Sequence, residues 1–194
     1  MIARDYREFF REFLFHPKAV GTVSPSSTNL ARHLADAVDW DHASTILEYG
    51  PGTGVITGEI VSRLPNQTDF YAIEISPQFA RILRERFPSI GILEGSVANA
   101  KTLCETEGLE QVDSIVSALP WAAFPKDEQE AYLEATVDVL KPGGQFISLG
   151  HLQGLLLPAG RRFRRKLSNY FSDVRVSKPV WGNFPPAFFY ICRR

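Results

Sequence analysis

Short apolar runs alternate with amphipathic stretches along most of this 194-residue chain. The apolar, β-prone runs lie at residues 45–49, 69–75, 90–94, 112–118 and 144–150, and two more close the chain at about 173–180 and 187–192. Apolar residues at helical spacing fill the stretches between the first five runs, at 55–64, 77–87, 98–107 and 127–140. Strands that alternate with helices of this length indicate βαβ units and a parallel sheet.

The two ends of the chain depart from this alternation. The last two strands are joined by Gly182-Asn183-Phe184-Pro185-Pro186, which is too short for a parallel crossover, so we expect the final strand to run antiparallel. At the other end, apolar side chains at helical spacing predict an amphipathic helix over 2–15, and Ser26 or Ser27 can cap a second helix at 28–38. We expect one domain over 1–194, with a helical cap at 1–40 and the sheet core at 41–194.

Composition excludes several classes of protein. Two cysteines and four scattered histidines give neither a disulfide framework nor a metal-ligand spacing, so we expect no metal. The sequence contains no run of 18 apolar residues, so we expect no transmembrane helix. Charged residues interrupt the apolar pattern of the first helix, which argues against a signal peptide and favours a cytoplasmic location.

The net charge of −1 conceals a strong asymmetry. Residues 21–160 carry 8 Lys/Arg against 18 Asp/Glu, whereas residues 161–194 carry 9 Lys/Arg against Asp173 alone. A basic end of this kind suits an anionic partner, either a membrane surface, a phospholipid headgroup or a nucleic acid. The alternative is a solubilising surface with no partner.

A glycine turn after the first strand carries most of the functional signal. Glu48 ends an apolar run, and Gly50, Gly52 and Gly54 follow before helical spacing begins. Such a turn lets backbone approach a nucleotide-like ligand closely. A dinucleotide fingerprint places its third glycine one position later, where this chain has Val55. Glu48 would repel a pyrophosphate, but it suits a ligand with a cationic amine.

Further polar residues lie where the later strands end, which is where ligands bind in doubly wound sheets. Glu74 ends the second apolar run, and a carboxylate there can accept hydrogen bonds from ribose hydroxyls. Its alternative role is to cap the helix that starts after Ser76-Pro77. The third run is followed by Ser96, and the fifth ends at His151.

These residues together resemble the class I S-adenosylmethionine-dependent methyltransferases, over roughly residues 43–150. The resemblance implies a Rossmann-like, seven-stranded sheet of order 3-2-1-4-5-7-6, mostly parallel, with an antiparallel last strand and helices on both faces. It implies that Gly50, Gly52 and Gly54 hold the cofactor, that Glu48 serves its methionyl amine and that Glu74 binds its ribose. Ile75, Ser96 and Val97 complete the predicted cofactor contacts, although the family commonly has Asp where this chain has Ser96. The product would be S-adenosylhomocysteine.

The flanking segments are similar to bacterial phospholipid N-methyltransferases, in residues 9–27, 116–120 and 183–187. This resemblance implies a monomer that binds an anionic membrane surface peripherally and methylates phosphatidylethanolamine or a related aminolipid. The residues predicted for catalysis are Ser117, Leu119 and His151. Those predicted for substrate or membrane contact are Tyr6, Arg11, Trp121, Arg161, Arg162, Arg164, Arg165 and Asn183.

Two other functions compete with this one. An rRNA adenine dimethyltransferase would have an Asn-Leu-Pro-Tyr type motif, with the Asn holding the adenine amine, where this chain has Ser117-Ala118-Leu119-Pro120-Trp121. The missing Asn makes a nucleic-acid substrate less favoured. The second alternative is a protein that binds the cofactor without transferring its methyl group, which the serine at position 96 keeps open.

Overall fold

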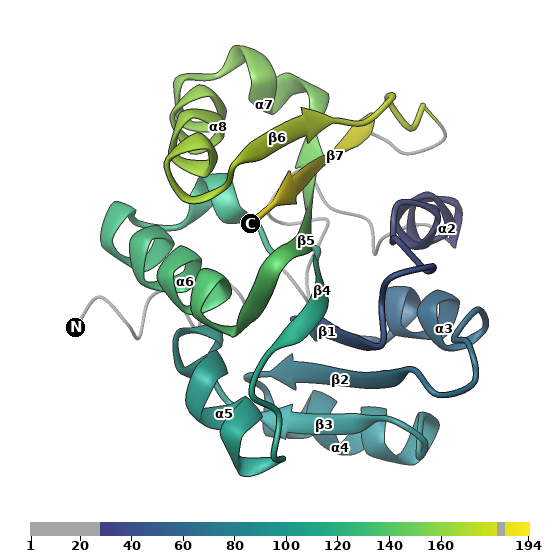
Figure 1. Ribbon diagram of the computed structural model, residues 1–194. Helices are drawn as coiled ribbons and strands as arrows, with labels where there is room; N and C mark the ends of the chain where they lie inside the picture. The colour runs from purple at the N-terminus through teal and green to yellow at the C-terminus, as the bar shows by residue number, and fades with distance from the viewer. Residues whose placement is uncertain (1–27, 182–184) are drawn as a thin grey trace.

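The computed structural model describes residues 28–181 and 185–194, and within them the chain forms one seven-stranded sheet of order β3-β2-β1-β4-β5-β7-β6 (Figure 1). Neighbouring strands among β1 to β5 pair in parallel, while β7 runs antiparallel to both β5 and β6. The predicted strand order and the antiparallel last strand are therefore confirmed. The strands are β1 (Thr45–Tyr49), β2 (Asp69–Glu74), β3 (Gly91–Glu94), β4 (Val112–Ser117), β5 (Leu140–His151), β6 (Asp173–Val176) and β7 (Ala187–Arg193).

Helices cover both faces of the sheet (Figure 1). On one face, α5 (Ala100–Thr106), α6 (Lys126–Val139) and α8 (Pro158–Tyr170) bury a large apolar core that includes Trp121. On the other face, α2 (Thr28–Asp36) and α3 (Val55–Val61) pack over β1, β4 and β5. The remaining helical segments are α4 (Pro77–Arg86), α7 (Leu152–Leu156) and the short 3₁₀ turns η1 (Val97–Asn99) and η2 (Trp121–Ala123).

The predicted helix at 2–15 and the capping residues Ser26 and Ser27 lie outside the described residues. Within the part of the chain that is described, no helix is both long and apolar enough to cross a membrane.

The start of the fifth strand differs from its predicted boundary at 144. This strand begins at Leu140, which pairs with Val112, and a shift of register between Val112 and Ser114 accommodates the turn at 141–144 inside the strand. After it, α7 and α8 are separate helices, because Leu157 precedes Pro158 and takes an extended conformation (φ −77°, ψ 145°).

The buried Gln145 joins the sheet to the chain after α2. Its Oε1 accepts a hydrogen bond from the Asp39 backbone N–H at 3.0 Å, and its Nε2 donates to the Ala37 carbonyl at 2.9 Å. Gln145 is 3% exposed, so both hydrogen bonds are made by a buried side chain. A single side chain therefore fixes the approach of the α2–β1 connection to β5.

We expect Gln145→Ala to lower the free energy of unfolding by about 1–3 kcal/mol, because it leaves two backbone groups without partners. Urea denaturation followed by circular dichroism measures the change. The matched control is Gln153→Ala, which removes an exposed glutamine from α7 and is expected to alter stability by less than about 0.5 kcal/mol. Equal stability of the two variants would contradict a stapling role for Gln145.

Candidate active site

The order of the strands places the topological switch point of the sheet between β1 and β4. Chain connections leave β1 toward β2 and β3 on one side, and leave β4 toward β5 on the other. In open α/β sheets, ligands bind outside the carboxyl ends of the strands at such a switch point. The carboxyl ends here are Tyr49 and Ser117, which are paired in register. The glycine turn follows the first of them directly.

The glycines of this turn are required by close packing as well as by backbone conformation. Gly50, Gly52 and Gly54 all have positive φ, at 66°, 54° and 77°. A Cβ at Gly50 would lie 2.4 Å from a methyl carbon of Leu119, at the end of β4. A Cβ at Gly54 would lie 2.7 Å from the Phe87 ring. The turn thus packs closely against the neighbouring elements at Gly50 and Gly54, where a side chain would not fit.

The Glu74 carboxylate fastens the glycine turn to the end of β2. One oxygen accepts a hydrogen bond from the Gly52 N–H at 3.0 Å, and the other accepts from the Ser76 N–H at 2.8 Å. The side chain is 0% exposed, and burial raises the pKa of this carboxyl against the opposing effect of the N–H donors. Ser76 itself caps α4 through its hydroxyl, so the proposed alternative of Glu74 as the helix cap does not hold.

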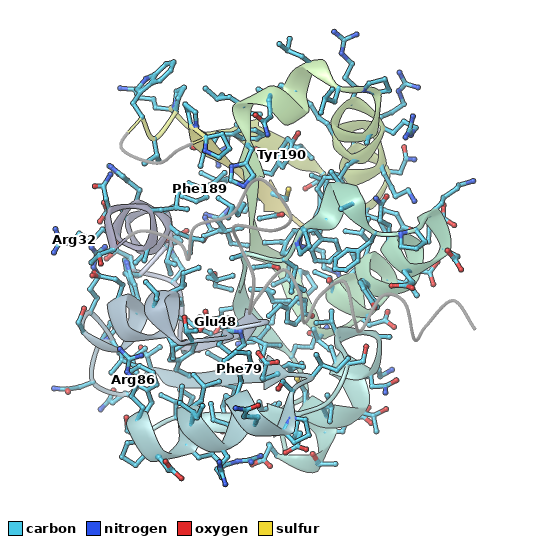
Figure 2. All side chains as sticks on the ribbon, turned by 180° about the vertical axis from the view of Figure 1, so that it is seen from behind. Arg32, Glu48, Phe79, Arg86, Phe189 and Tyr190 are labelled. Carbon is cyan, nitrogen blue, oxygen red and sulfur yellow. The ribbon has the colours of Figure 1, made fainter. Side chains whose placement is uncertain are left out.

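Glu48 lies beneath the turn and is bound by a residue that the sequence did not single out. Its Oε2 accepts a hydrogen bond of 2.7 Å from the Thr57 hydroxyl of α3. Glu48 is 1% exposed, and Figure 2 shows it inside the molecule, in contrast to Arg32 at the surface. Burial raises the pKa of the Glu48 carboxyl to about 8. A polar threonine among the apolar residues of this short helix is the feature that could have pointed to this contact.

A cationic, hydroxyl-bearing ligand fits this pair of carboxylates. Within the described residues, neither Glu48 nor Glu74 forms a salt bridge, although the negative charge of Glu74 contributes to the raised pKa of Glu48. Buried carboxylates without a cation are costly in a protein. The donor set fits S-adenosylmethionine, because its sulfonium and amine supply positive charge and its ribose supplies hydroxyl donors to Glu74.

The remaining predicted cofactor contacts lie directly after β2, at Ile75, and at the start of η1, at Ser96 and Val97. Ile75 is 37% exposed directly after Glu74, which is unusual for a large apolar side chain beside a buried strand. The Ser96 hydroxyl accepts from the Ala98 N–H at 3.3 Å and also interacts with the phenol of Tyr132. Val97 is only 7% exposed and belongs to the apolar core. Ile75 and Ser96 are therefore the more accessible members of this predicted group.

The β4 turn is an internally bonded unit. The Ser117 hydroxyl accepts from the Trp121 indole N–H at 2.9 Å and from the Leu119 N–H at 3.3 Å, and Ser117 is 0% exposed. The Leu119 carbonyl accepts from the Trp121 N–H at 2.9 Å. Gln129, which the sequence did not single out, donates from its amide to the carbonyls of Trp121 and Phe124. These contacts hold the turn in place against Gly50.

The expectation that Trp121 offers an open ring face to a substrate is not met. Trp121 is 1% exposed and stacks on Phe163 of α8 with ring centroids 5.8 Å apart. The edges of Phe124, Tyr132 and Phe146 also meet its ring. The sequence alone does not distinguish an aromatic residue of the core from one that lines a ligand site. In the structure, side chains of α6 and α8 pack against Trp121 and place it in the core.

His151 ends β5 and immediately precedes α7. Its backbone is paired with Ala187 of β7, and its ring is partly buried. Burial lowers the pKa of His151 below its ordinary value of 6.5, opposed by a hydrogen bond with the Pro185 backbone. Among the described residues, its buried Nδ1 has no hydrogen-bond partner. A neutral imidazole with an unpaired nitrogen at a carboxyl strand end is suited to accept a proton.

The arginines predicted for substrate or membrane contact are exposed on α8, namely Arg161, Arg162, Arg164 and Arg165. Tyr6, Arg11 and Asn183 lie outside the described residues. Any contact that these four arginines make with a substrate or a membrane would therefore be made at the outer surface of α8.

A cavity of about 340 Å³ lies at the opposite, amino-terminal edge of the strands, lined in part by Lys141 and Arg193. The charges around it are already paired, Lys141 with Asp113 at 2.7 Å and Arg193 with Asp39 at 2.5 Å. The glycine turn and Glu74 are not among its lining residues, so it is separate from the candidate active site.

Comparison with known proteins identifies the family. Residues 46–144, about half of the chain, match the family model described as a methyltransferase domain. The chain is 34% identical over 194 residues, 98% of its length and 96% of the relative's, to an ornithine lipid N-methyltransferase from Singulisphaera acidiphila. A shorter match, 31% identical over 78 residues, covers 40% of this chain and 28% of a ribosomal RNA small subunit methyltransferase A from Chlorobium phaeobacteroides.

The fold has a counterpart among solved structures. N-methyltransferase NodS from Bradyrhizobium japonicum, in complex with S-adenosylhomocysteine, superposes with a TM-score of 0.72 over 97% of both chains, at 17% identity. The match to the family model, the near full-length relative and the geometry of the glycine turn agree. The chain belongs to the class I S-adenosylmethionine-dependent methyltransferases, with S-adenosylmethionine as its cofactor and S-adenosylhomocysteine as its product.

Proposed function

We propose that this enzyme N-methylates the primary amine of an aminolipid at the surface of a membrane. The observation that carries the proposal is the 34% identity to an ornithine lipid N-methyltransferase, which extends over 98% of the chain and so includes the segments outside the cofactor-binding core. We take ornithine lipid as the first candidate substrate and phosphatidylethanolamine as the second. Both present a primary amine beside a membrane surface.

Within this proposal, bound S-adenosylmethionine would supply a methyl group on a sulfonium sulfur. The amine lone pair would form the new N–C bond as the C–S bond breaks, and S-adenosylhomocysteine would leave as a neutral thioether. Gly50, Gly52 and Gly54 would hold the cofactor, and Glu74 would accept hydrogen bonds from its ribose. The Glu48 carboxyl would serve the methionyl amine from beneath the turn, with Thr57 holding one of its two oxygens. Because burial raises the pKa of this carboxyl to about 8, a bound ammonium would favour its ionised form.

The amine must be deprotonated before it can attack, since it is an ammonium at neutral pH. His151 would take this proton, because burial lowers its pKa and so leaves the imidazole unprotonated at neutral pH. Its Nδ1 also has no hydrogen-bond partner within the described residues. The Leu119 carbonyl, already accepting from Trp121, has a second lone pair with which to orient the amine. Ser117 is engaged as an acceptor and would act by positioning the Leu119 turn.

Methyl transfer to lipid vesicles tests the proposed function directly. Purified enzyme with S-adenosylmethionine labelled in its methyl group is expected to label vesicles that contain ornithine lipid or phosphatidylethanolamine, and mass spectrometry of the extracted lipid should show added methyl groups. Vesicles of phosphatidylglycerol alone, which has no amine, are the control. Label that enters ribosomal RNA and no lipid would overturn the proposal in favour of a nucleic-acid methyltransferase.

We expect Glu74→Gln to weaken binding of S-adenosylmethionine about tenfold to a hundredfold, the range for the loss of a charged hydrogen-bond partner. Isothermal titration calorimetry measures the dissociation constant. Glu94→Gln is the matched control, because Glu94 ends the neighbouring strand in register with Glu74 but is exposed. If both variants bound the cofactor as the parent chain does, Glu74 would have no part in the site.

We expect His151→Gln to lower kcat for lipid methylation by about 100-fold or more, because general-base catalysis contributes a factor of this size. In the parent enzyme, the rate should rise with pH through a pKa below 6.5, as the imidazole becomes neutral. The variant should lose this step and regain activity at alkaline pH, where the amine deprotonates without help.

The control for this experiment is His42→Gln, which changes an exposed histidine at the opposite edge of the sheet. Rates measured across pH in mixed detergent–lipid micelles, together with cofactor affinity, separate catalysis from binding. An acidic limb that persists unchanged in His151→Gln would assign the proton transfer to another group.

A further inference from the structure

We infer that the junction of α7 and α8 is a membrane-docking surface, in which two leucines enter the bilayer interface while the arginines of α8 contact anionic headgroups. This inference rests on the proposed function, because it names the surface by which the enzyme would reach a lipid amine. We call this surface the α7–α8 corner, and it consists of Leu156, Leu157, Arg161, Arg162 and Arg165.

The apolar part of the corner is unusually exposed. Leu156 is 74% exposed and Leu157 is 54% exposed, whereas most large apolar side chains of the described residues are buried in the two cores. Leu156 ends α7 and Leu157 is the extended residue before Pro158, so both project from the point at which the chain turns into α8. Adjacent exposed leucines at a turn are costly in water and gain free energy at a bilayer interface.

The basic part of the corner complements an anionic surface. Helix α8 carries five basic residues and no acidic one. Phe163 and Leu167 face the core, and helical spacing puts Arg161, Arg162 and Arg165 on the opposite side. Within the described residues, none of these three arginines forms a salt bridge, whereas Lys166 is held internally by Glu130 at 3.2 Å. The outward charge is therefore not neutralised by the protein.

Trp181 lies at the same end of the molecule and serves as a natural reporter. It is 72% exposed in the connection between β6 and β7. That connection is tied to the start of α7, because the Leu152 N–H donates to the Pro186 carbonyl at 2.9 Å, and Val180 bridges to Ala187. Figure 1 shows α7, α8 and the β6–β7 strands together at one end of the fold. An exposed indole is typical of residues at a membrane interface.

The corner is continuous with the candidate active site. His151 is the residue before α7, and Leu156 ends this helix, so the two are separated by about 8 Å along the helix axis. Docking of the leucines at the depth of the headgroups would thus bring the carboxyl end of β5 to the level of a lipid amine. A nucleic acid would use the arginines in the same way but would give the exposed leucines no favourable environment, so the observations favour a bilayer.

Vesicle sedimentation of the full chain tests the corner without any need for catalysis. The vesicles contain phosphatidylglycerol mixed with phosphatidylcholine, or phosphatidylcholine alone. We expect the parent chain to bind the anionic vesicles and Leu156→Asp/Leu157→Asp to bind them at least about tenfold more weakly. Arg162→Glu/Arg165→Glu should lose at least about tenfold and should abolish the preference for anionic lipid. The tryptophan fluorescence should shift to the blue on binding, and Trp181→Phe should remove this shift.

The matched control is Arg81→Glu/Ile82→Asp, which changes an exposed basic residue and an exposed apolar residue on α4. It is expected to bind vesicles as the parent does, and calorimetry with S-adenosylmethionine confirms that every variant is folded. Leucine variants that sediment like the parent, or a parent chain that does not bind, would overturn the inference. So would tight RNA binding that is lost in the arginine variant and retained in the leucine variant.

The proposed reaction can fail separately from the docking surface. If the corner is correct and the substrate is an aminolipid, the leucine variant should lose methylation of vesicles but keep methylation of detergent-dispersed lipid. If no aminolipid is methylated in either form, the sedimentation result still decides whether the corner binds membranes.

Discussion

The candidate active site depends on a buried carboxylate that holds a glycine-rich turn. Glu74 accepts hydrogen bonds from Gly52 and Ser76, and so binds the turn after β1 to the end of β2. A backbone hydrogen bond from the Gly50 N–H to the Ile73 carbonyl, 2.9 Å long, joins the same two elements. The carboxylate lies within the protein and has no cation beside it in the described residues, which is a cost in free energy. A ligand that donates ribose hydroxyls to Glu74 and brings positive charge near it would offset that cost.

Packing explains why the turn tolerates so little change. Gly50 faces Leu119 across the switch point, and Leu119 is held by the hydrogen bonds that Ser117 and Trp121 make within the β4 turn. The aromatic core under α6 and α8 therefore supports the cofactor side of the site through a short chain of contacts. This arrangement assigns Trp121 a supporting role, as a buried anchor for the β4 turn that packs against Gly50.

The sequence was sufficient where backbone geometry demands a particular residue type. A link too short for a crossover predicted the antiparallel last strand, and the family resemblance carried by the glycine turn and Glu74 implied the sheet order; both are confirmed. It was not sufficient where a side chain suits two environments. The indole of Trp121 can stack on a ligand or on Phe163, and only the tertiary placement of α8 distinguishes these. Thr57 was overlooked because its contact with Glu48 links two elements nine positions apart, which local patterns do not reveal.

The charge asymmetry of the chain acquires a physical meaning from the fold. The acidic segment forms the cofactor side of the sheet, where Glu48 and Glu74 suit a cation. The basic segment forms α8 and the last strands, at the other end of the strand order. A lipid with a cationic amine in an anionic membrane would match both segments. Its amine would face the carboxyl ends of the strands, and the membrane surface would face the basic residues of α8. This division of charge favours an enzyme that works at an anionic interface over one that binds a freely diffusing amine.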